Sequence, residues 1–135
     1  MKTIKSIFLT LTLLACSSLF AQQSNPAYTA VLSGTQAQID QGISKGSFEF
    51  VIVGVEQETQ AELIRQKAIL YKNEIGFTLK KDNATGLYTG KVTLDDGRKD
   101  MRWVFRLFLS GNINTVKIEN QEVPTTDFFQ QYLKN

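Results

Sequence analysis

The sequence predicts an α+β domain whose elements run strand, helix, strand, strand, helix and strand, with a short helix after the last strand. Three observations predict this class. Residues 48–55 alternate as a strand does, residues 59–75 carry an apolar stripe at helical spacing, and residues 82–86 form a turn-rich break between two strand-like segments. Helices interspersed with hairpin-forming strands are typical of an α+β domain.

The first strand is rich in β-branched and aromatic residues, F-E-F-V-I-V-G-V. Phe48, Phe50 and Ile52 fall on one side of an extended chain, whereas Val51 and Val53 fall on the other. A strand that is apolar on both sides near its end is expected in the middle of a sheet.

A helix is expected directly after this strand. Thr59 followed by Glu62 matches a capping box, in which each side chain bonds to the other residue's backbone N–H. The helix then carries an apolar residue every three or four positions, at Ala61, Ile64, Ala68, Tyr71 and Ile75.

A hairpin is expected over residues 76–94. Its turn, D-N-A-T-G, supplies side chains that bond to the backbone and a glycine that accepts a positive φ. The sequence predicts that two apolar residues of the first strand face inward and meet three of the second: Phe77 and Leu79, then Tyr88, Val92 and Leu94.

Residues 98–110 fit two periodicities. As a strand, every second residue from Met101 to Leu109 is apolar; as a helix, Met101, Val104 and Phe108 form a stripe. The helix is preferred because Asp95 and Asp96 precede it, where a cap belongs, and Gly111 and Asn112 follow it as stop residues. The strand alternative gives one helix packed on an antiparallel β-meander.

The chain is expected to end with a strand at residues 115–119 and a helix at residues 125–133. The complete order, β-α-β-β-α-β, is that of the ferredoxin-like split βαβ fold, with a short C-terminal helix added. We expect this terminal helix to cover Val51 and Val53 on the outer face of the sheet.

The N-terminus reads as a signal peptide over residues 1–21, with Lys2 and Lys5 before a short apolar run. Residues 22–46 then read as a flexible tether, although T-Q-A-Q at residues 35–38 is also compatible with the start of a short helix. Residues 47–135 are expected to form a single α+β domain. The expected location is secreted or periplasmic; the alternative is lipid anchoring through Cys16, in L-L-A-C.

Charge and composition exclude several function classes. Lys2 and Lys5 are two of the chain's 15 basic residues, so cleavage after Ala21 leaves 13 basic residues against 13 acidic ones. Such a neutral domain is not expected to bind nucleic acid, and no later segment predicts a transmembrane helix. The chain has no histidine and its one cysteine is Cys16, so histidine triads, thiol nucleophiles, and imidazole or thiolate metal sites are not expected. We expect no cofactor and no enzymatic activity.

Residues 48–119 resemble a heavy-metal-associated domain in element order, length and the glycine-containing turn after the first strand. In that family the turn reads Gly-Met-x-Cys-x-x-Cys; Gly54 and Val55 match its start, but no cysteine follows. The resemblance implies the ferredoxin-like fold and, without soft ligands, no metal transfer. Three acids near the turn, Glu56, Glu58 and Glu62, are explained by the helix dipole. The densest acids, Asp95, Asp96 and Asp100, are explained as caps; a divergent metal-dependent or carboxylate-based enzyme is the alternative that these acids leave open.

The candidate partner-binding surface is a basic face on the second helix: Arg98, Lys99, Arg102, Trp103 and Arg106. Guanidinium groups pair with carboxylates or phosphates, so the expected partner is another envelope protein or an anionic ligand. The same face is also what the wet side of any amphipathic helix presents. The leading hypothesis is an exported non-catalytic binding or interaction module, and an envelope lipoprotein accessory subunit is a further alternative. The sequence leaves the oligomeric state open.

Overall fold

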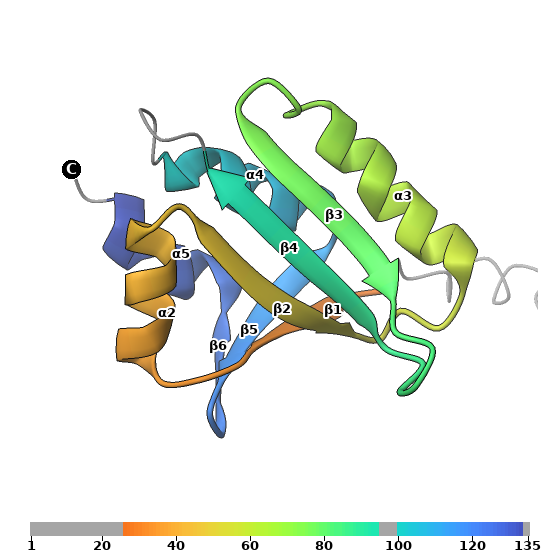
Figure 1. Ribbon diagram of the computed structural model, residues 1–135, viewed down its shortest axis with the longest axis horizontal. Helices are drawn as coiled ribbons and strands as arrows, with labels where there is room; N and C mark the ends of the chain where they lie inside the picture. The colour runs from red at the N-terminus through yellow and green to blue at the C-terminus, as the bar shows by residue number, and fades with distance from the viewer. Residues whose placement is uncertain (1–25, 95–99, 134–135) are drawn as a thin grey trace, which may run out of the picture.

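The computed structural model describes residues 26–94 and 100–133, which form an α+β fold of four helices and one six-stranded mixed sheet (Figure 1). In chain order the elements are β1 (Tyr28–Leu32), α2 (Gln36–Ser44), β2 (Ser47–Val53), α3 (Glu58–Ile69), β3 (Ile75–Lys81), β4 (Tyr88–Leu94), α4 (Met101–Ser110), β5 (Ile113–Ile118), β6 (Gln121–Pro124) and α5 (Thr125–Leu133).

The sheet order is β3-β4-β2-β1-β5-β6, in which β1 and β5 are parallel and all other neighbours antiparallel. The predicted split βαβ unit is present, because β4 lies between β2 and β3. The four-stranded ferredoxin-like sheet is not matched, since β1 separates β2 from β5 and β6 adds an outer strand. The structure therefore confirms the α+β class but corrects the ferredoxin-like order.

The tether expected over residues 22–46 is wrong for its described part, which folds into β1 and α2. Tyr28 and Leu32 of β1 are buried, and α2 begins with a capping box between Thr35 and Gln38: Thr35 N donates to Gln38 Oε1 (2.9 Å), and Gln38 N donates to Thr35 Oγ1 (3.3 Å). The alternative of a short helix that starts at T-Q-A-Q is thus confirmed, and packing against the sheet stabilises a helix of this length.

Hydrogen bonds join α2 to α5 at one end of the fold. The Tyr132 hydroxyl donates to Asp40 Oδ1 (2.5 Å) and accepts from Gln36 Nε2 (3.0 Å). Burial, followed by the neighbouring Asp40 carboxylate, raises the pKa of Tyr132 above its ordinary value of 10.0. The contact ties the first helix of the described chain to the last.

The bounds of α3 differ from those that the sequence predicts. Its N-terminus is not held by a Thr59–Glu62 capping box, because the helix begins one residue before Thr59; instead Gln60 Oε1 accepts from Gln57 N (3.0 Å). The helix ends at Ile69, and Ile75 is the first residue of β3 rather than the last of the stripe.

Residues 101–110 form the predicted helix α4, so the antiparallel-meander alternative is wrong. The cap is Asp100, whose side chain accepts from Arg102 N (3.0 Å), and the C-cap is Gly111. Asp95 and Asp96, the predicted caps, lie outside the described residues. The hairpin turn is as predicted: Asp82 Oδ1 accepts from Ala84 N (2.9 Å).

The core lies on one face of the sheet, where aromatic rings from three elements meet. Phe50 of β2 packs against Phe108 of α4 at a ring-centroid distance of 5.0 Å, and Phe108 packs edge-on against Phe129 of α5 at 5.2 Å. The terminal helix therefore joins this core face. It does not cover the opposite face, where Val53 is 48% exposed. The expectation that the terminal helix covers Val51 and Val53 is therefore wrong. Within the described residues no helix has the length and apolar character needed to cross a bilayer.

Candidate functional site

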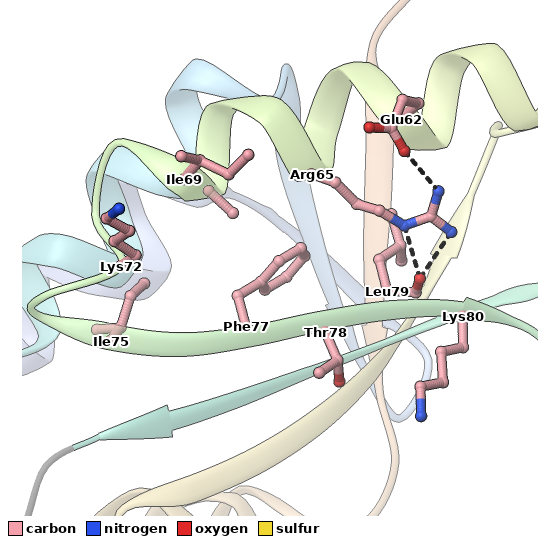
Figure 2. Close-up of a pocket in the computed structure, with 10 residues that line it drawn as sticks. Glu62, Arg65, Ile69, Lys72, Ile75, Phe77, Thr78, Leu79 and Lys80 are labelled. Atoms are coloured by element: carbon pink, nitrogen blue, oxygen red, sulfur yellow. Dashed lines mark hydrogen bonds and ion pairs between the residues drawn. The ribbon is translucent and has the colours of Figure 1, made fainter.

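A cleft of about 470 Å³ runs between α3 and β3 (Figure 2). We call it the α3–β3 cleft. Its volume is in the range that ligand sites in proteins occupy, about 300–1,000 Å³. It is lined by the helix residues Glu62, Arg65, Ala68 and Ile69, by Lys72 in the connection, and by the strand residues Ile75, Phe77, Thr78, Leu79 and Lys80.

The strand side of the cleft is an edge of the sheet, because β4 is the only strand paired with β3 in the described chain. Asp82 N donates to Leu87 O (2.8 Å), which continues the hydrogen-bond ladder between β3 and β4 into the turn. This bond identifies Asp82 and Leu87 as a hydrogen-bonded pair. Bonded and non-bonded pairs alternate in an antiparallel ladder. The even-numbered residues of β3 therefore bond to β4, and the odd-numbered residues direct their N–H and C=O groups out of the sheet.

Two of these outward groups already have partners within the fold. Ile75 N donates to Tyr71 O (3.0 Å), and Leu79 O accepts from Arg65 Nε (2.9 Å) and Nη2 (2.7 Å). Phe77 lies between them, and no hydrogen bond from its outward N–H or C=O to another described residue is shown. The centre of the edge is thus left open beside the cleft.

The cleft has an apolar floor that solvent reaches. Ile69 is 59% exposed although it is aliphatic, and Phe77 is half-buried. Figure 2 shows Phe77 pointing from β3 toward α3, whereas Thr78 and Lys80 point to the opposite side of the strand. Phe77 is held from below by Phe50, at a ring-centroid distance of 6.4 Å. Phe77 is therefore packed against the hydrophobic core, whereas Ile69 contributes the exposed part of the floor.

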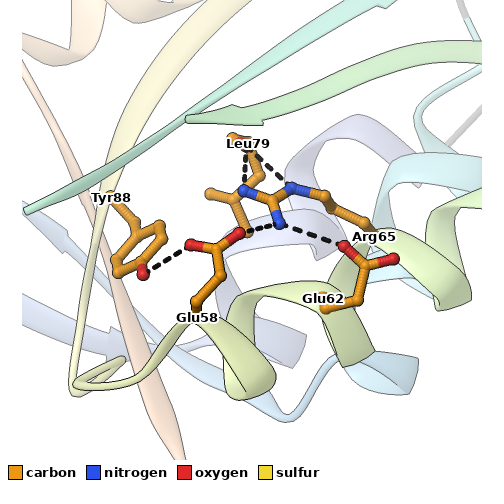
Figure 3. A network of polar contacts seen from close by, with 5 residues as sticks. All are labelled: Glu58, Glu62, Arg65, Leu79 and Tyr88. Carbon is orange, nitrogen blue, oxygen red and sulfur yellow. Dashed lines mark hydrogen bonds and ion pairs between the residues drawn. The ribbon is translucent and has the colours of Figure 1, made fainter. Parts of the chain in front are cut away.

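Arg65 organises one end of the cleft (Figure 3). While two of its nitrogens donate to Leu79 O, its Nη1 pairs with both Glu58 and Glu62, the latter at 3.1 Å. Glu58 in turn accepts from the Tyr88 hydroxyl (2.8 Å). The network joins α3, β3 and β4, and it satisfies the guanidinium on three sides. This placement also shows that α3 overhangs the edge of the sheet, because its arginine reaches a carbonyl that faces away from β4.

The electrostatics of this network keep its carboxylate ionised. Hydrogen bonds from Arg65, and then from Tyr88, hold the pKa of Glu58 below its ordinary value of 4.5. The same carboxylate raises the pKa of Tyr88 and, first among its causes, that of Arg65. A general acid working near neutral pH needs a carboxyl pKa shifted the other way. The arrangement is suited to fixing geometry rather than to moving protons.

The predicted basic surface is only partly described, because Arg98 and Lys99 lie outside the described residues. The Arg102 side chain bonds to Asp100, the N-cap residue of the same helix: its Nε and Nη2 donate to the Asp100 carboxylate, with Nη2 at 2.6 Å from Oδ2. Arg106 lies over the ring of Trp103, with its Cζ 4.9 Å from the centroid. The described cations of this face thus have intramolecular partners, and Asp100 is an ion-paired cap whose pKa is lowered, chiefly by Arg102.

The described acidic residues form no cluster of the kind that holds a metal ion. Glu58 and Glu62 share Arg65, and over residues 26–94 and 100–133 no group of three or more acidic, histidine or cysteine side chains is arranged to hold a metal ion. The sequence also missed the α3–β3 cleft. One weak signal was present: Ile69 is a large apolar residue outside the helical stripe, but Leu63 is equally exposed on the same helix and lies outside the cleft, so the sequence did not single out this position.

No protein-family model, curated protein or solved structure matches the chain. The resemblance to heavy-metal-associated domains therefore stays a prediction.

Proposed function

We propose that the protein is an exported, non-catalytic binding module whose ligand surface is the α3–β3 cleft. The single observation that carries this proposal is the open centre of the β3 edge, at Phe77, directly beside an exposed apolar floor. Proteins usually blunt or cover such edges, because an unpaired strand is a template for association. A short open segment of strand edge next to apolar surface is a feature that a binding partner would use.

The charges around the cleft support binding rather than catalysis. Glu58 and Glu62 are engaged by Arg65, and the lowered pKa of Glu58 keeps it from acting as a proton donor at neutral pH. The network instead fixes α3 over the strand edge, so that the cleft is preformed. Preformed surfaces bind more tightly, because less conformational entropy is lost on association.

Site-specific photo-crosslinking in the producing cells tests the surface. Benzoylphenylalanine replaces Ile69 in the cleft or, as the matched control, Leu63, which lies on the same helix outside the cleft and is equally exposed at 60% against 59%. We expect an ultraviolet-dependent adduct from position 69 and none from position 63. Equal labelling, or labelling from position 63 alone, would remove the α3–β3 cleft as the ligand surface.

The exported state has a separate test, because it rests on the N-terminal pattern. Mass spectrometry of the purified mature chain distinguishes a free N-terminus at Gln22 from an acylated Cys16. A lipid on Cys16 would favour the lipoprotein alternative, and an intact Met1 would contradict export.

A further inference from the structure

Building on the proposed function, we propose that the ligand of the α3–β3 cleft is an extended peptide with an apolar side chain flanked by acidic residues, which binds as an additional strand along β3. Peptides are recognised in this way at exposed sheet edges, where backbone hydrogen bonds supply affinity and side-chain pockets supply specificity.

The backbone of β3 offers a short, defined segment for pairing. The N–H of Ile75 and the C=O of Leu79 are already used, by Tyr71 and Arg65 respectively. Between them lie the C=O of Ile75, both groups of Phe77 and the N–H of Leu79, all on the odd-numbered side of the strand. In an antiparallel arrangement, the peptide residue opposite Phe77 donates its N–H to the C=O of Phe77, and its C=O accepts from the N–H of Phe77. The two occupied groups limit the pairing to about five residues of peptide.

The side chains match an alternating peptide. An added strand directs successive residues to opposite faces of the sheet. One face of the added strand lies toward α3, where Ile69 of α3 and Phe77 of β3 form the apolar floor. The apolar residue of the peptide binds on this face. The other face lies beside Thr78 and Lys80, which point away from α3 (Figure 2). A peptide with one buried residue between two polar ones fits both faces at once.

The charge of the cleft selects acidic flanks. Among the lining residues three are basic and one is acidic. Arg65 is balanced by Glu58 and Glu62, whereas Lys72 and Lys80 are exposed and have no ion pair with another described residue. They stand near opposite ends of β3, as Figure 2 shows. A carboxylate of the peptide diagonal to Lys80 gains cross-strand attraction, and one that extends past Ile75 gains attraction from Lys72 in the connection; lysines at either place would be repelled.

Selection of twelve-residue peptides displayed on phage, against the purified mature chain, provides the probe. We expect the enriched peptides to alternate apolar and polar residues and to be rich in Asp and Glu. A synthetic peptide of the enriched sequence is then titrated by calorimetry. Amide hydrogen exchange followed by NMR reports the binding mode: the amide of Phe77 exchanges more slowly in the complex, because it becomes a donor to the added strand.

Two pairs of variants separate the cleft from the rest of the helix. Ile69→Asp weakens binding by at least about tenfold, because it places a charge on the apolar floor, whereas Leu63→Asp leaves it within about twofold. Lys80→Glu weakens binding of the acidic peptide by about fivefold or more and makes this binding less sensitive to salt. The control Lys67→Glu, on α3 outside the cleft, changes neither the affinity nor its dependence on salt. Circular dichroism confirms that each variant is folded.

Three results would overturn the inference. One is enrichment of lysine-rich peptides; another is a peptide that binds Ile69→Asp as well as the native chain; the third is binding that leaves the exchange of the Phe77 amide unchanged. Failure of this inference is distinguishable from failure of the proposed function. If no peptide is enriched but photo-crosslinking at position 69 still yields an adduct, the cleft binds something other than an extended peptide. If position 69 gives no specific adduct either, both proposals fail.

Discussion

Replacing Gly90 with alanine tests the packing that supports the α3–β3 cleft from below. Gly90 of β4 lies opposite Phe50 of β2, and a Cβ added to it would meet the Phe50 ring at 2.6 Å from Cζ and 2.7 Å from Cε2. Such distances are far inside normal contact. The ring is fully buried against Phe108 and Phe77, so it has little freedom to move aside.

The expected effect is a net destabilisation. Overpacking a core by one methyl group costs about 1–3 kcal/mol, and replacing glycine gains about 0.4–1 kcal/mol from the lower entropy of the unfolded chain. The clash is the larger effect, so Gly90→Ala should lower the free energy of unfolding by about 1–2 kcal/mol. Urea denaturation measures this as a midpoint lower by about 0.5–1.5 M at an unchanged slope.

A matched control uses the same substitution in the same sheet. Gly76 of β3 is exposed, and an added Cβ would come no closer than 3.3 Å, to the Cβ of Thr93. We expect Gly76→Ala to change the free energy of unfolding by less than about 0.5 kcal/mol. In addition, Phe50→Leu should be less destabilising in the Gly90→Ala background than in the native chain, since it removes the clashing ring carbons. A Gly90→Ala variant as stable as the native protein would refute the proposed packing of Phe50 on Gly90.

Two further predictions concern polar contacts. Thr125→Val removes the buried hydroxyl that donates to Ile113 O (2.7 Å), and should lower the free energy of unfolding by about 1–3 kcal/mol in urea denaturation, whereas Thr126→Val at the exposed neighbouring position should change it little. Glu58 has a folded-state pKa below its ordinary 4.5, so its stabilising contribution is present above pH 4.5 and is lost as the pH falls through the folded value. Stability measured from pH 7 down to pH 3 should therefore decline less steeply in Glu58→Gln than in the native chain, and a steeper decline in the variant would contradict the Arg65 pairing.

Local patterns predicted those elements whose neighbours lie nearby in the chain. The alternation of Phe48, Phe50 and Ile52 marks the buried face of β2, and the structure buries all three. The choice of helix over strand at α4 was correct, and its stop signal is local: Gly111 is the C-cap, whereas the N-cap is Asp100 rather than Asp95 or Asp96. β1 was missed although one of its partners, β2, is the next strand: it is only five residues long, and its other partner, β5, lies far along the chain. A strand of this kind is stabilised by pairing that its own sequence does not encode.

The candidate site was missed for a related reason. Whether a strand is at an edge depends on the order of strands in the sheet, and the residues of β3 are compatible with an interior position as well as an edge. The basic face of α4 was visible in the sequence, yet its pairing was not: Asp100 accepts from Arg102, and Trp103 lies beneath Arg106. Cations in a helical repeat show where charge lies, whereas their intramolecular partners appear only in three dimensions.

The position of β1 has a consequence for how the polypeptide matures. It is the first strand of the described chain, yet it lies in the interior of the sheet between β2 and β5, so Leu32 pairs with Phe50 on one side and with Ile118 on the other. The sheet therefore cannot close until synthesis has passed β5. Contacts between such distant segments slow folding. A ribosome-bound chain should remain open to proteases and chaperones until its last quarter emerges. A truncation that deletes β1 should leave two half-sheets instead of a slightly smaller domain.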